Sequence, residues 1–213
     1  RESPTKEVSF DYKHKKQSGG SGQFAHIKGK LSPIESDSED SFEFEEHVVG
    51  GRIPKQYIPA IEKGFRDSLG KGPIAEYPVV GTRIDLDDGS FHEVDSSEKA
   101  FYTAAQGCFR EYFKKAGPKL LEPIMNIEIE VPEDFQGPVV GDVIRRRGIM
   151  TSNDIIERVS VIKAEVPLAE TFGYATDLRS LTQGQGTFTM ELATYRQVPS
   201  HIQEDIIEDK KKQ

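Results

Sequence analysis

The sequence predicts an α+β fold in which two domains, residues 1–120 and 121–198, precede a charged tail, residues 199–213. The first half reads as three strands followed by a helix, a strand and a second helix. The second half shows strand and helix signals in the order βαββαβ, which is the split β-α-β arrangement. Between the halves, Gly117-Pro118 ends a helical pattern before a new apolar run begins. A chain of 213 residues is long enough for two domains that each bury a core.

Three stretches of the first domain show the apolar alternation that is typical of strands. They are residues 8–16, 24–31 and 42–48. A glycine-rich connection, residues 17–23, lies between the first two and predicts that they pair. The acidic, polar stretch 36–41 predicts a loop before the third strand.

The next part of the first domain is predicted to be a helix followed by a strand. Apolar residues from Ile58 to Leu69 recur at spacings of three and four, which predicts a helix that ends at Gly70. Residues 79–86 predict a strand, and the polar residues Asp87–Ser90 predict a turn after it.

A longer helix is predicted from Asp95 to Gly117. Asp95 suits the N-cap position, and Glu98, three residues later, suits the reciprocal position of a capping box. The only cysteine, Cys108, falls in the apolar stripe of this helix, which indicates a small buried side chain and not a nucleophile. A single cysteine also excludes a disulfide framework and a thiolate zinc site.

The elements of the second domain follow from apolar periodicity and from glycine and proline stops. The predicted strands are residues 124–131, 149–151, 159–166 and 188–195, and the predicted helices are residues 135–147 and 167–184. The tail after Pro199 ends in three lysines and a glutamine, and is predicted to be a short helix that frays.

The distribution of charge bears on the class of partner. The net charge of −8 argues against indiscriminate binding to nucleic acid. Residues 12–34, however, hold no acid and five lysines, and a second basic feature is the triplet Arg145, Arg146 and Arg147. These two features suit a polyanion that is contacted at particular places. The alternative is that they are ordinary solvated faces.

The sequence also bears on location. No apolar run approaches the ~20 residues that a transmembrane helix needs. The first residues are polar and lack the apolar core of a secretory signal. We therefore expect no membrane contact and a reducing, cytoplasmic setting.

We find no pattern that predicts catalysis. Residues 70–72 lack the spacing and the hydroxyl of a phosphate-binding loop, and in residues 85–89 glycine stands one position too early for a calcium loop. His92, Glu93 and Asp95 could form an acid–base group, but no nucleophile or metal pair stands beside them at a diagnostic spacing. We predict no catalytic residue and no metal ligand. A stand-alone enzyme or a small RNA-binding module stays open as a rival interpretation.

Five strings, in order along nearly the whole chain, resemble the carboxy-terminal third of translation elongation factor G, the ribosomal translocase. They are QSGGSGQFAHI at 17–27, VVGGRIPKQYIPAIEKG at 48–64, DGSFHEVDSSEKAF at 88–101, LLEPIMNIEIEVPEDFQGPVVGDVIRRRG at 120–148 and AEVPLAETFGYATDLRSLTQGQG at 164–186. Several long strings are far more specific than one short motif. The chain is similar to domains IV and V of this family.

The resemblance implies a fold and a role. The fold is a domain like the second domain of ribosomal protein S5, followed by a ferredoxin-like domain. The role is that of the ribosome-binding part of a translational GTPase that promotes the movement of tRNA and mRNA. Domain IV reaches the A site at the small-subunit decoding centre, and domain V faces the large-subunit factor-binding centre. The residues that match the domain IV tip are Ser18, Gly19, Gly20, Ser21, Gly22 and Gln23 in one loop, and His92, Glu93, Ser96 and Ser97 in another.

Further expectations accompany the resemblance. Secondary RNA contacts are expected at Lys15, Lys16, Arg145, Arg146, Arg147 and Gln185. In this family the GTP-binding domain precedes the matched region, so GTP and Mg²⁺ are expected to bind outside this chain. We expect the fragment to be a monomer without enzymatic activity of its own.

The sequence departs from the family pattern at three places. Ser21 stands where a basic residue is typical, Phe24-Ala25 where tyrosine-glycine is usual, and Gln185 where an arginine is common. The loss of two charges weakens attraction to phosphate. The alternative function is that of a related ribosome-bound GTPase that acts in ribosome recycling or ribosome protection.

Overall fold

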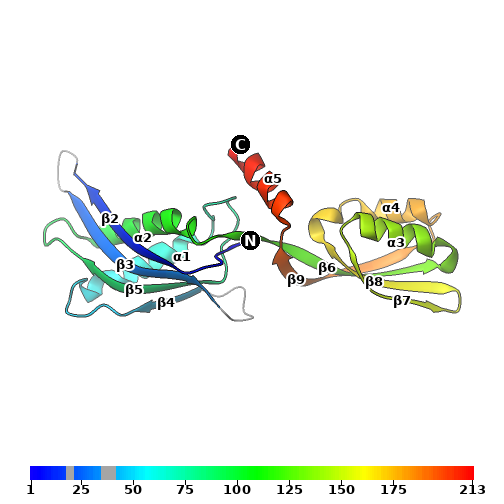
Figure 1. The fold of residues 1–213 in the computed structure, drawn as a ribbon, viewed down its shortest axis with the longest axis horizontal. Helices are drawn as coiled ribbons and strands as arrows, with labels where there is room; N and C mark the ends of the chain where they lie inside the picture. Colours follow the sequence, from blue (N-terminus) through cyan, green and yellow to red (C-terminus); the bar gives the residue numbers. More distant parts are fainter. Residues whose placement is uncertain (18–21, 35–41) are drawn as a thin grey trace. The chain divides into compact units, whose positions relative to one another are not determined.

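The computed structural model describes residues 1–17, 22–34 and 42–213. The chain forms two compact units (Figure 1). Residues 1–120 together with 198–213 make unit 1, and residues 121–197 make unit 2. Each unit has a β-sheet with helices packed on one face, which confirms the α+β class that the sequence predicts.

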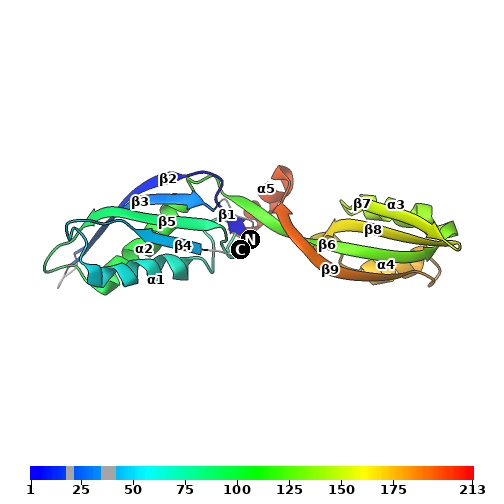
Figure 2. The same ribbon diagram turned by 90° about the horizontal axis from the view of Figure 1, so that it is seen from below.

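Unit 1 is built on a four-stranded sheet. Its main elements are β2 Val8–Lys16, β3 Gln23–Pro33, β4 Phe42–Glu46, η1 Lys55–Tyr57, α1 Ile58–Ser68, β5 Thr82–Ser90, α2 Glu98–Phe113 and α5 Ser200–Lys211. The strand order is β2-β3-β5-β4, with β4 and β5 parallel and the other neighbours antiparallel. Helices α1 and α2 cover one face of this sheet (Figure 2). No helix among the described residues covers the other face, which we call the open face.

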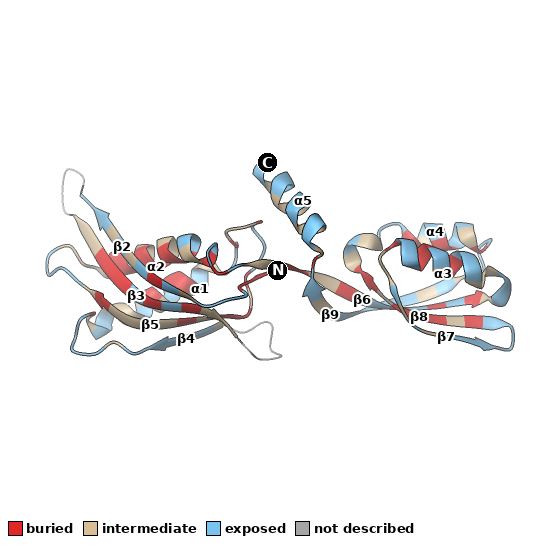
Figure 3. Cartoon of the chain, viewed as in Figure 1, coloured by how far each residue is buried: buried red, intermediate tan, exposed pale blue. Residues whose placement is uncertain are grey.

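The alternation of the strands decides which side chains form the core of unit 1. Successive strand residues point to opposite faces, so Phe10, Ile27 and Ile84 all lie on the helix side, at most 3% exposed. They belong to the same apolar cluster as Phe65 of α1 and Phe101 of α2. Figure 3 shows where buried residues lie along the strands and the two helices.

Unit 2 has the predicted split β-α-β order. Its elements are β6 Lys119–Pro132, η2 Glu133–Phe135, α3 Gln136–Arg145, β7 Ile149–Ile156, β8 Val159–Pro167, η3 Leu168–Glu170, α4 Tyr174–Leu181 and β9 Thr187–Gln197. The strand order β9-β6-β8-β7, antiparallel throughout, is that of a ferredoxin-like fold. Its core lies between the sheet and helices α3 and α4.

A short strand at the start of the chain, β1 Glu2–Ser3, is not predicted by the sequence. It pairs with the first residues of β6. The carboxylate of Glu2 is fully buried and accepts hydrogen bonds from the N–H groups of Ile74, Ala75 and Tyr77 at 3.0, 3.1 and 2.9 Å. Three N–H donors replace the water that this carboxylate gives up.

The predicted start and end of the second helix are wrong. Helix α2 runs from Glu98 to Phe113, and Ser97 is its N-cap because the Ser97 Oγ accepts a hydrogen bond from Ala100 N at 3.0 Å. Asp95 lies in the preceding loop, where its backbone oxygen accepts a hydrogen bond from Phe24 N. Serine and aspartate are equally good N-caps, so a tertiary contact settles which one is used.

The predicted turn at Asp87–Ser90 is wrong, because β5 continues to Ser90. The register between β3 and β5 shifts at Lys28/Gly29, which marks a β-bulge. A Cβ on Gly29 would lie 1.9 Å from the backbone oxygen of Asp85, so only glycine fits this close approach. The turn-like composition therefore reflects a bulge within a continuous strand.

The helix predicted to open at Pro167 begins later. A short 3₁₀ turn, η3, comes first, and α4 starts at Tyr174. Between them Gly173 takes a left-handed conformation with φ 73°, which interrupts a continuous helix. Phe172 consequently lies outside the helix and is 78% exposed.

The segment predicted to be a separate charged tail, residues 199–213, belongs to unit 1. Most of it is helix α5, whose Ile202 and Ile206 pack in a cluster with Ala75 and Leu120. The Gln203 side chain also accepts a hydrogen bond from Leu120 N at 3.1 Å. The tail is therefore a packed element with one apolar face.

Candidate nucleic-acid interface

The two segments that the resemblance assigns to one tip meet in unit 1. Phe24 N donates a hydrogen bond to the Asp95 backbone oxygen at 2.9 Å, and Ser96 Oγ donates to the Phe24 backbone oxygen at 2.8 Å. A Cβ on Gly22 would lie 3.1 Å from the Asp95 carboxylate. We call residues 22–24 and 92–97 together the tip. The other expected tip residues, Ser18, Gly19, Gly20 and Ser21, lie outside the described residues.

His92 is held by hydrogen bonds within its own loop. His92 N donates to Ser96 Oγ at 2.8 Å, and Ser96 N donates to the His92 backbone oxygen at 3.0 Å. The His92 side chain is 58% exposed, and its Nδ1 accepts long hydrogen bonds of 3.4 Å from the N–H groups of Val94 and Asp95. Because Nδ1 accepts, the neutral ring carries its proton on Nε2, which can donate to an external acceptor.

The remaining tip side chains differ in how free they are. The rings of Phe24 and His92 lie 6.3 Å apart, and the Gln23 amide oxygen is 2.8 Å from Nε2 of His14. Glu93 is exposed, whereas the Ser97 hydroxyl is engaged as the helix cap. The tip therefore offers aromatic rings for stacking, at Phe24 and His92, and a hydrogen-bond donor, at His92 Nε2. Its bulk can also occupy space in a binding site.

The expected secondary contacts on β2 separate onto two faces. Lys15 lies opposite Phe24 on the open side of the sheet, whereas Lys16 lies opposite Gln23 on the helix side. Both lysines are exposed, and so is Gln185 in the loop between α4 and β9.

The arginine triplet at the end of α3 is largely engaged inside unit 2. The Arg146 side chain is 8% exposed; it donates to Asp142, Asp177 and the Glu170 backbone oxygen, and lies over the Tyr174 ring. Arg146 therefore joins α3 to α4 and is not free to meet an external phosphate.

The other two arginines differ in exposure. Arg147 donates to Glu122 at 2.9 and 3.0 Å and to Glu170 at 3.2 Å, with 27% of its side chain exposed. Arg145 pairs with Asp142 but keeps 70% of its side chain exposed. Of the triplet, Arg145 is the most accessible to a polyanion.

A hydrogen-bonded Ser–His–Asp chain crosses three strands of the open face, and the sequence does not suggest it. His26 Nδ1 is 2.8 Å from Ser90 Oγ, and His26 Nε2 is 2.6 Å from Asp11 Oδ1. His26 and Ser90 are directly paired in the sheet ladder, which engages backbone donors that an oxyanion hole would need free. We therefore assign the Asp11–His26–Ser90 hydrogen bonds a structural role, which is to connect β2, β3 and β5.

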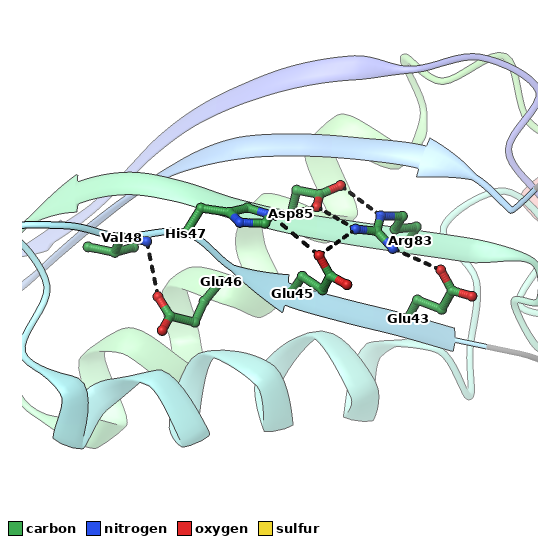
Figure 4. Close-up of polar contacts among 7 residues, drawn as sticks. All are labelled: Glu43, Glu45, Glu46, His47, Val48, Arg83 and Asp85. Carbon is green, nitrogen blue, oxygen red and sulfur yellow. Dashed lines mark hydrogen bonds and ion pairs between the residues drawn. The ribbon is translucent and has the colours of Figure 1, made fainter.

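A second polar network on the open face also escapes sequence reasoning (Figure 4). Ligand atoms of Glu45, His47 and Asp85 lie within 4.8 Å of one another, which is close enough to share a metal ion. The guanidinium of Arg83, however, is 2.9 Å from Glu45 and from Asp85 and 3.0 Å from Glu43, and supplies the positive charge there. We therefore propose no metal site.

The same network shifts the pKa values of His47 and Asp85. The hydrogen bond to Asp85 raises the pKa of His47 above its usual value. Partial burial by itself would raise the pKa of Asp85, but hydrogen bonds from Arg83 and His47 outweigh it, so this pKa lies below its usual value. Both shifts favour the charged forms, which attract each other at the contact between His47, the residue after β4, and Asp85 of β5.

Residues 70–72 do not suit a nucleotide phosphate. A Cβ on Gly72 would lie 2.3 Å from the Glu2 carboxylate, so an acid already occupies the space beside this glycine. Lys71 pairs with Glu76 at 3.1 Å. A carboxylate at this position repels a phosphate.

Comparison with protein families identifies the two parts of the chain. Residues 1–117 match the family model of elongation factor G, domain IV, and residues 119–206 match that of the elongation factor G C-terminus. This chain belongs to the elongation factor G family. Domain IV provides the sheet, α1, α2 and the tip of unit 1, and the C-terminal domain provides unit 2 and most of α5.

Several relatives match the whole chain. Elongation factor G of Rhodopirellula baltica is 82% identical over 212 residues, which cover 100% of this chain and 30% of the relative. Elongation factor G 1 of Syntrophus aciditrophicus is 49% identical over 98% of this chain and 30% of the relative. A crystal structure from Thermus thermophilus has a TM-score of 0.84 at 38% identity and covers 100% of this chain and 32% of that one. The chain thus spans about 30% of the length of these elongation factor G relatives.

The helices carry no sign of a membrane span. Within residues 1–17, 22–34 and 42–213, none of them combines the length and the apolar character needed to cross a bilayer.

Proposed function

We propose that this chain is the ribosome-binding part of a translational GTPase of the elongation factor G type. In this proposal the tip enters the A site at the small-subunit decoding centre and promotes the advance of tRNA and mRNA. The observation that carries the proposal is the joining of the two tip segments by the Phe24–Asp95 and Ser96–Phe24 hydrogen bonds. An exposed histidine donor beside an aromatic ring suits contact with RNA phosphates, 2′-hydroxyls and bases.

The chain acts in this proposal through shape and contact and not through bond-making groups. GTP and Mg²⁺ are bound by a part of the parent protein outside these residues. Unit 2 faces the large-subunit factor-binding centre, where the exposed side chains of Arg145 and Gln185 are available to RNA. The protein acts as a monomer in the cytoplasm, with the ribosome, tRNA and mRNA as its partners.

The test is single-turnover translocation by the full-length factor that carries His92→Ala. The change removes one outward hydrogen-bond donor and leaves the backbone of the loop intact. We expect the translocation rate to fall by about fivefold to tenfold, which corresponds to about 1 kcal/mol, the net contribution of one ordinary hydrogen bond. Ribosome-stimulated GTP turnover should stay within about twofold of the wild-type rate, because in this proposal a part of the parent protein outside these residues binds the nucleotide.

The matched control is His201→Ala, which removes an exposed histidine from helix α5. It should leave the translocation rate unchanged. Equal rates for wild type, His92→Ala and His201→Ala would contradict the proposed role of the tip.

A second candidate function is ribosome recycling or ribosome protection by a related GTPase. It is favoured by the family departures at Ser21, Phe24-Ala25 and Gln185. Exchange of residues 17–24 and 91–97 with those of an established translocase separates the two functions. Translocase activity of the original chain in the full factor supports the first. Activity that appears only after the exchange supports the second.

A further inference from the structure

Four lysines share the open face of the unit 1 sheet, and we call Lys13, Lys15, Lys28 and Lys30 the lysine row. Directly opposite pairs of β2 and β3 are Ser9–Lys30, Asp11–Lys28, Lys13–His26 and Lys15–Phe24. Members of such a pair lie on the same face of a sheet, and alternate residues of a strand do so too. All four lysines are exposed, whereas their neighbours Ile27, Gly29 and Leu31 are buried on the helix side.

Most carboxylates that share this face have a hydrogen-bond or ion-pair partner within the domain. Asp11 lies 2.6 Å from His26 and 3.9 Å from Lys28, and Asp88 lies 2.6 Å from Arg52. On β4 and β5, Glu43, Glu45 and Asp85 share the single guanidinium of Arg83, as Figure 4 shows, so acids outnumber this arginine on that half of the face.

The lysine row itself is left largely without such partners. Lys13, Lys15 and Lys30 make no ion pair in the described part of the chain, although Lys30 lies directly opposite Asp85 of β5. Asp87 at the bulge is the one carboxylate of β5 there without an ion pair. The β2–β3 half of the face therefore presents positive charge, even though the whole chain carries −8.

Protection of a sheet edge does not explain the row. Strand β2 is an edge strand, and edge lysines discourage pairing with another sheet. Lys28 and Lys30, however, lie on β3, which is flanked by β2 and β5. Edge protection does not explain their charge, and each lies directly opposite a carboxylate of β5, Asp88 for Lys28 and Asp85 for Lys30.

The row ends at the tip. Four successive pairs span three steps of two residues, or about 20 Å along the strands. The pair nearest the tip is Lys15–Phe24, and the Phe24 ring lies 6.3 Å from the His92 ring. Charge along the strands and the aromatic pair at the tip thus form one continuous surface.

We propose that the lysine row binds the phosphate backbone of a double-stranded RNA helix and guides the tip along it. This inference rests on the proposed function and names the surface that the ribosomal RNA would meet. A single strand is a poorer occupant, because proteins that hold single strands present a series of aromatic platforms, whereas this face presents lysines and one aromatic pair at its end. A duplex is held through its backbone charges, which a flat row of lysines matches.

The experiment is binding of this chain to an RNA duplex of about 16 base pairs, followed by fluorescence anisotropy across about 50 to 200 mM salt. The test variant is Lys13→Gln/Lys15→Gln/Lys30→Gln. Its affinity should fall at least about tenfold, and the slope of log affinity against log salt should fall by about three, because each lost phosphate contact removes about one.

Two matched variants separate this surface from net charge. Lys55→Gln/Lys99→Gln/Lys114→Gln removes the same number of exposed lysines from η1, α2 and the residue after α2, and should keep the wild-type slope. Lys13→Arg/Lys15→Arg/Lys30→Arg keeps the charge and should also keep it. Equal losses in the test and control triples, no duplex binding by wild type, or tighter binding to a single strand would each overturn the proposal.

Failure of this inference is distinguishable from failure of the proposed function. One result is that His92→Ala slows translocation but the test triple binds duplex and ribosomes like wild type. This result contradicts duplex binding by the lysine row and supports the role of the tip in translocation. The other result is that the test triple loses affinity for the duplex while His92→Ala translocates at the wild-type rate. This result supports duplex binding by the lysine row and contradicts the proposed role of the tip.

Discussion

At the scale of single residues, the buried hydroxyl of Tyr174 is a polar group that unit 2 leaves unsatisfied. Its Oη has no hydrogen-bond partner among the described residues, although the residue is 2% exposed. The ring is fixed from two sides, by the Arg146 guanidinium 5.0 Å above it and by the edge contact with Phe188 at 5.0 Å. Burial raises the pKa of Tyr174 to about 12.

Tyr174→Phe tests this account of the hydroxyl. At neutral pH the free energy of unfolding should stay unchanged or rise by up to about 1 kcal/mol, because the change removes a buried hydroxyl without a partner. In wild type the folded state keeps the phenol proton while the unfolded state, with a pKa near 10.0, loses it, so stability falls as pH rises from 10 to about 12. Urea unfolding of both proteins over this pH range is the measurement. An identical fall in the variant would contradict the assignment.

Arg146 shows at the same scale how neighbours set a residue's role. Its buried guanidinium is shared by Asp142, Asp177 and the backbone of Glu170. Removing one partner of a buried ion pair is costly, because the other charge stays buried alone. The arginine is thus part of the core of unit 2 and no longer one of its candidate RNA contacts.

At the scale of elements, the start of α2 links the helix to the tip. Ser97 caps the helix through Ala100 N, and the residue before it, Ser96, bonds to Phe24. Asp95 is thereby fixed outside the helix. Its backbone oxygen accepts from Phe24, so capping and tip geometry are set by consecutive residues.

Ser97→Ala should lower the free energy of unfolding of unit 1 by about 1 kcal/mol, because the N–H of Ala100 loses its acceptor. Asp95→Ala is the matched control and should cost less than about 0.5 kcal/mol, since its side chain does not cap the helix. Chemical denaturation followed by circular dichroism measures both. A larger loss of unfolding free energy for Asp95→Ala than for Ser97→Ala would contradict the assignment of Ser97 as the N-cap and would favour Asp95.

At the scale of the whole molecule, the chain leaves unit 1 at Leu120 and re-enters it at Val198. The backbone of both residues is joined, because Val198 N donates to the Leu120 oxygen at 2.9 Å. Helix α5 then covers the cluster of Ala75 and Leu120 with its apolar face. Unit 1 is therefore complete only when the last segment of the chain has returned to it.

Ile202→Ser/Ile206→Ser tests that completion. We expect unit 1 to lose about 2 kcal/mol of stability, because two half-buried isoleucines leave the cluster. Hydrogen exchange should rise in residues 72–80 and 119–120 and stay unchanged in residues 125–190. The control Glu204→Ser/Glu208→Ser changes the exposed face of α5 and should leave both regions as they are. Faster exchange confined to unit 2 would contradict the grouping.

The sequence by itself determined the alternating faces of the strands, the order of the main strands and helices from β2 to β9 and, through long matching strings, the family. These properties are local, because a period of two or of three to four residues and a Gly-Pro stop act within a few positions. The sequence signalled less clearly the β7–β8 hairpin, which closes at Glu157 and Arg158 with φ of 52° and 66°, where glycine or asparagine is the usual signal.

Only the tertiary structure decided the N-cap of α2, the bulge at Asp87, the burial of Arg146 and the attachment of α5 to unit 1. It also decided that Phe24 meets Asp95 and that four lysines of two strands share one open face. Each of these depends on residues far apart in the chain or on which neighbour fills a space. A local pattern offers several acceptable outcomes at such positions, and packing and hydrogen bonding between distant segments select one.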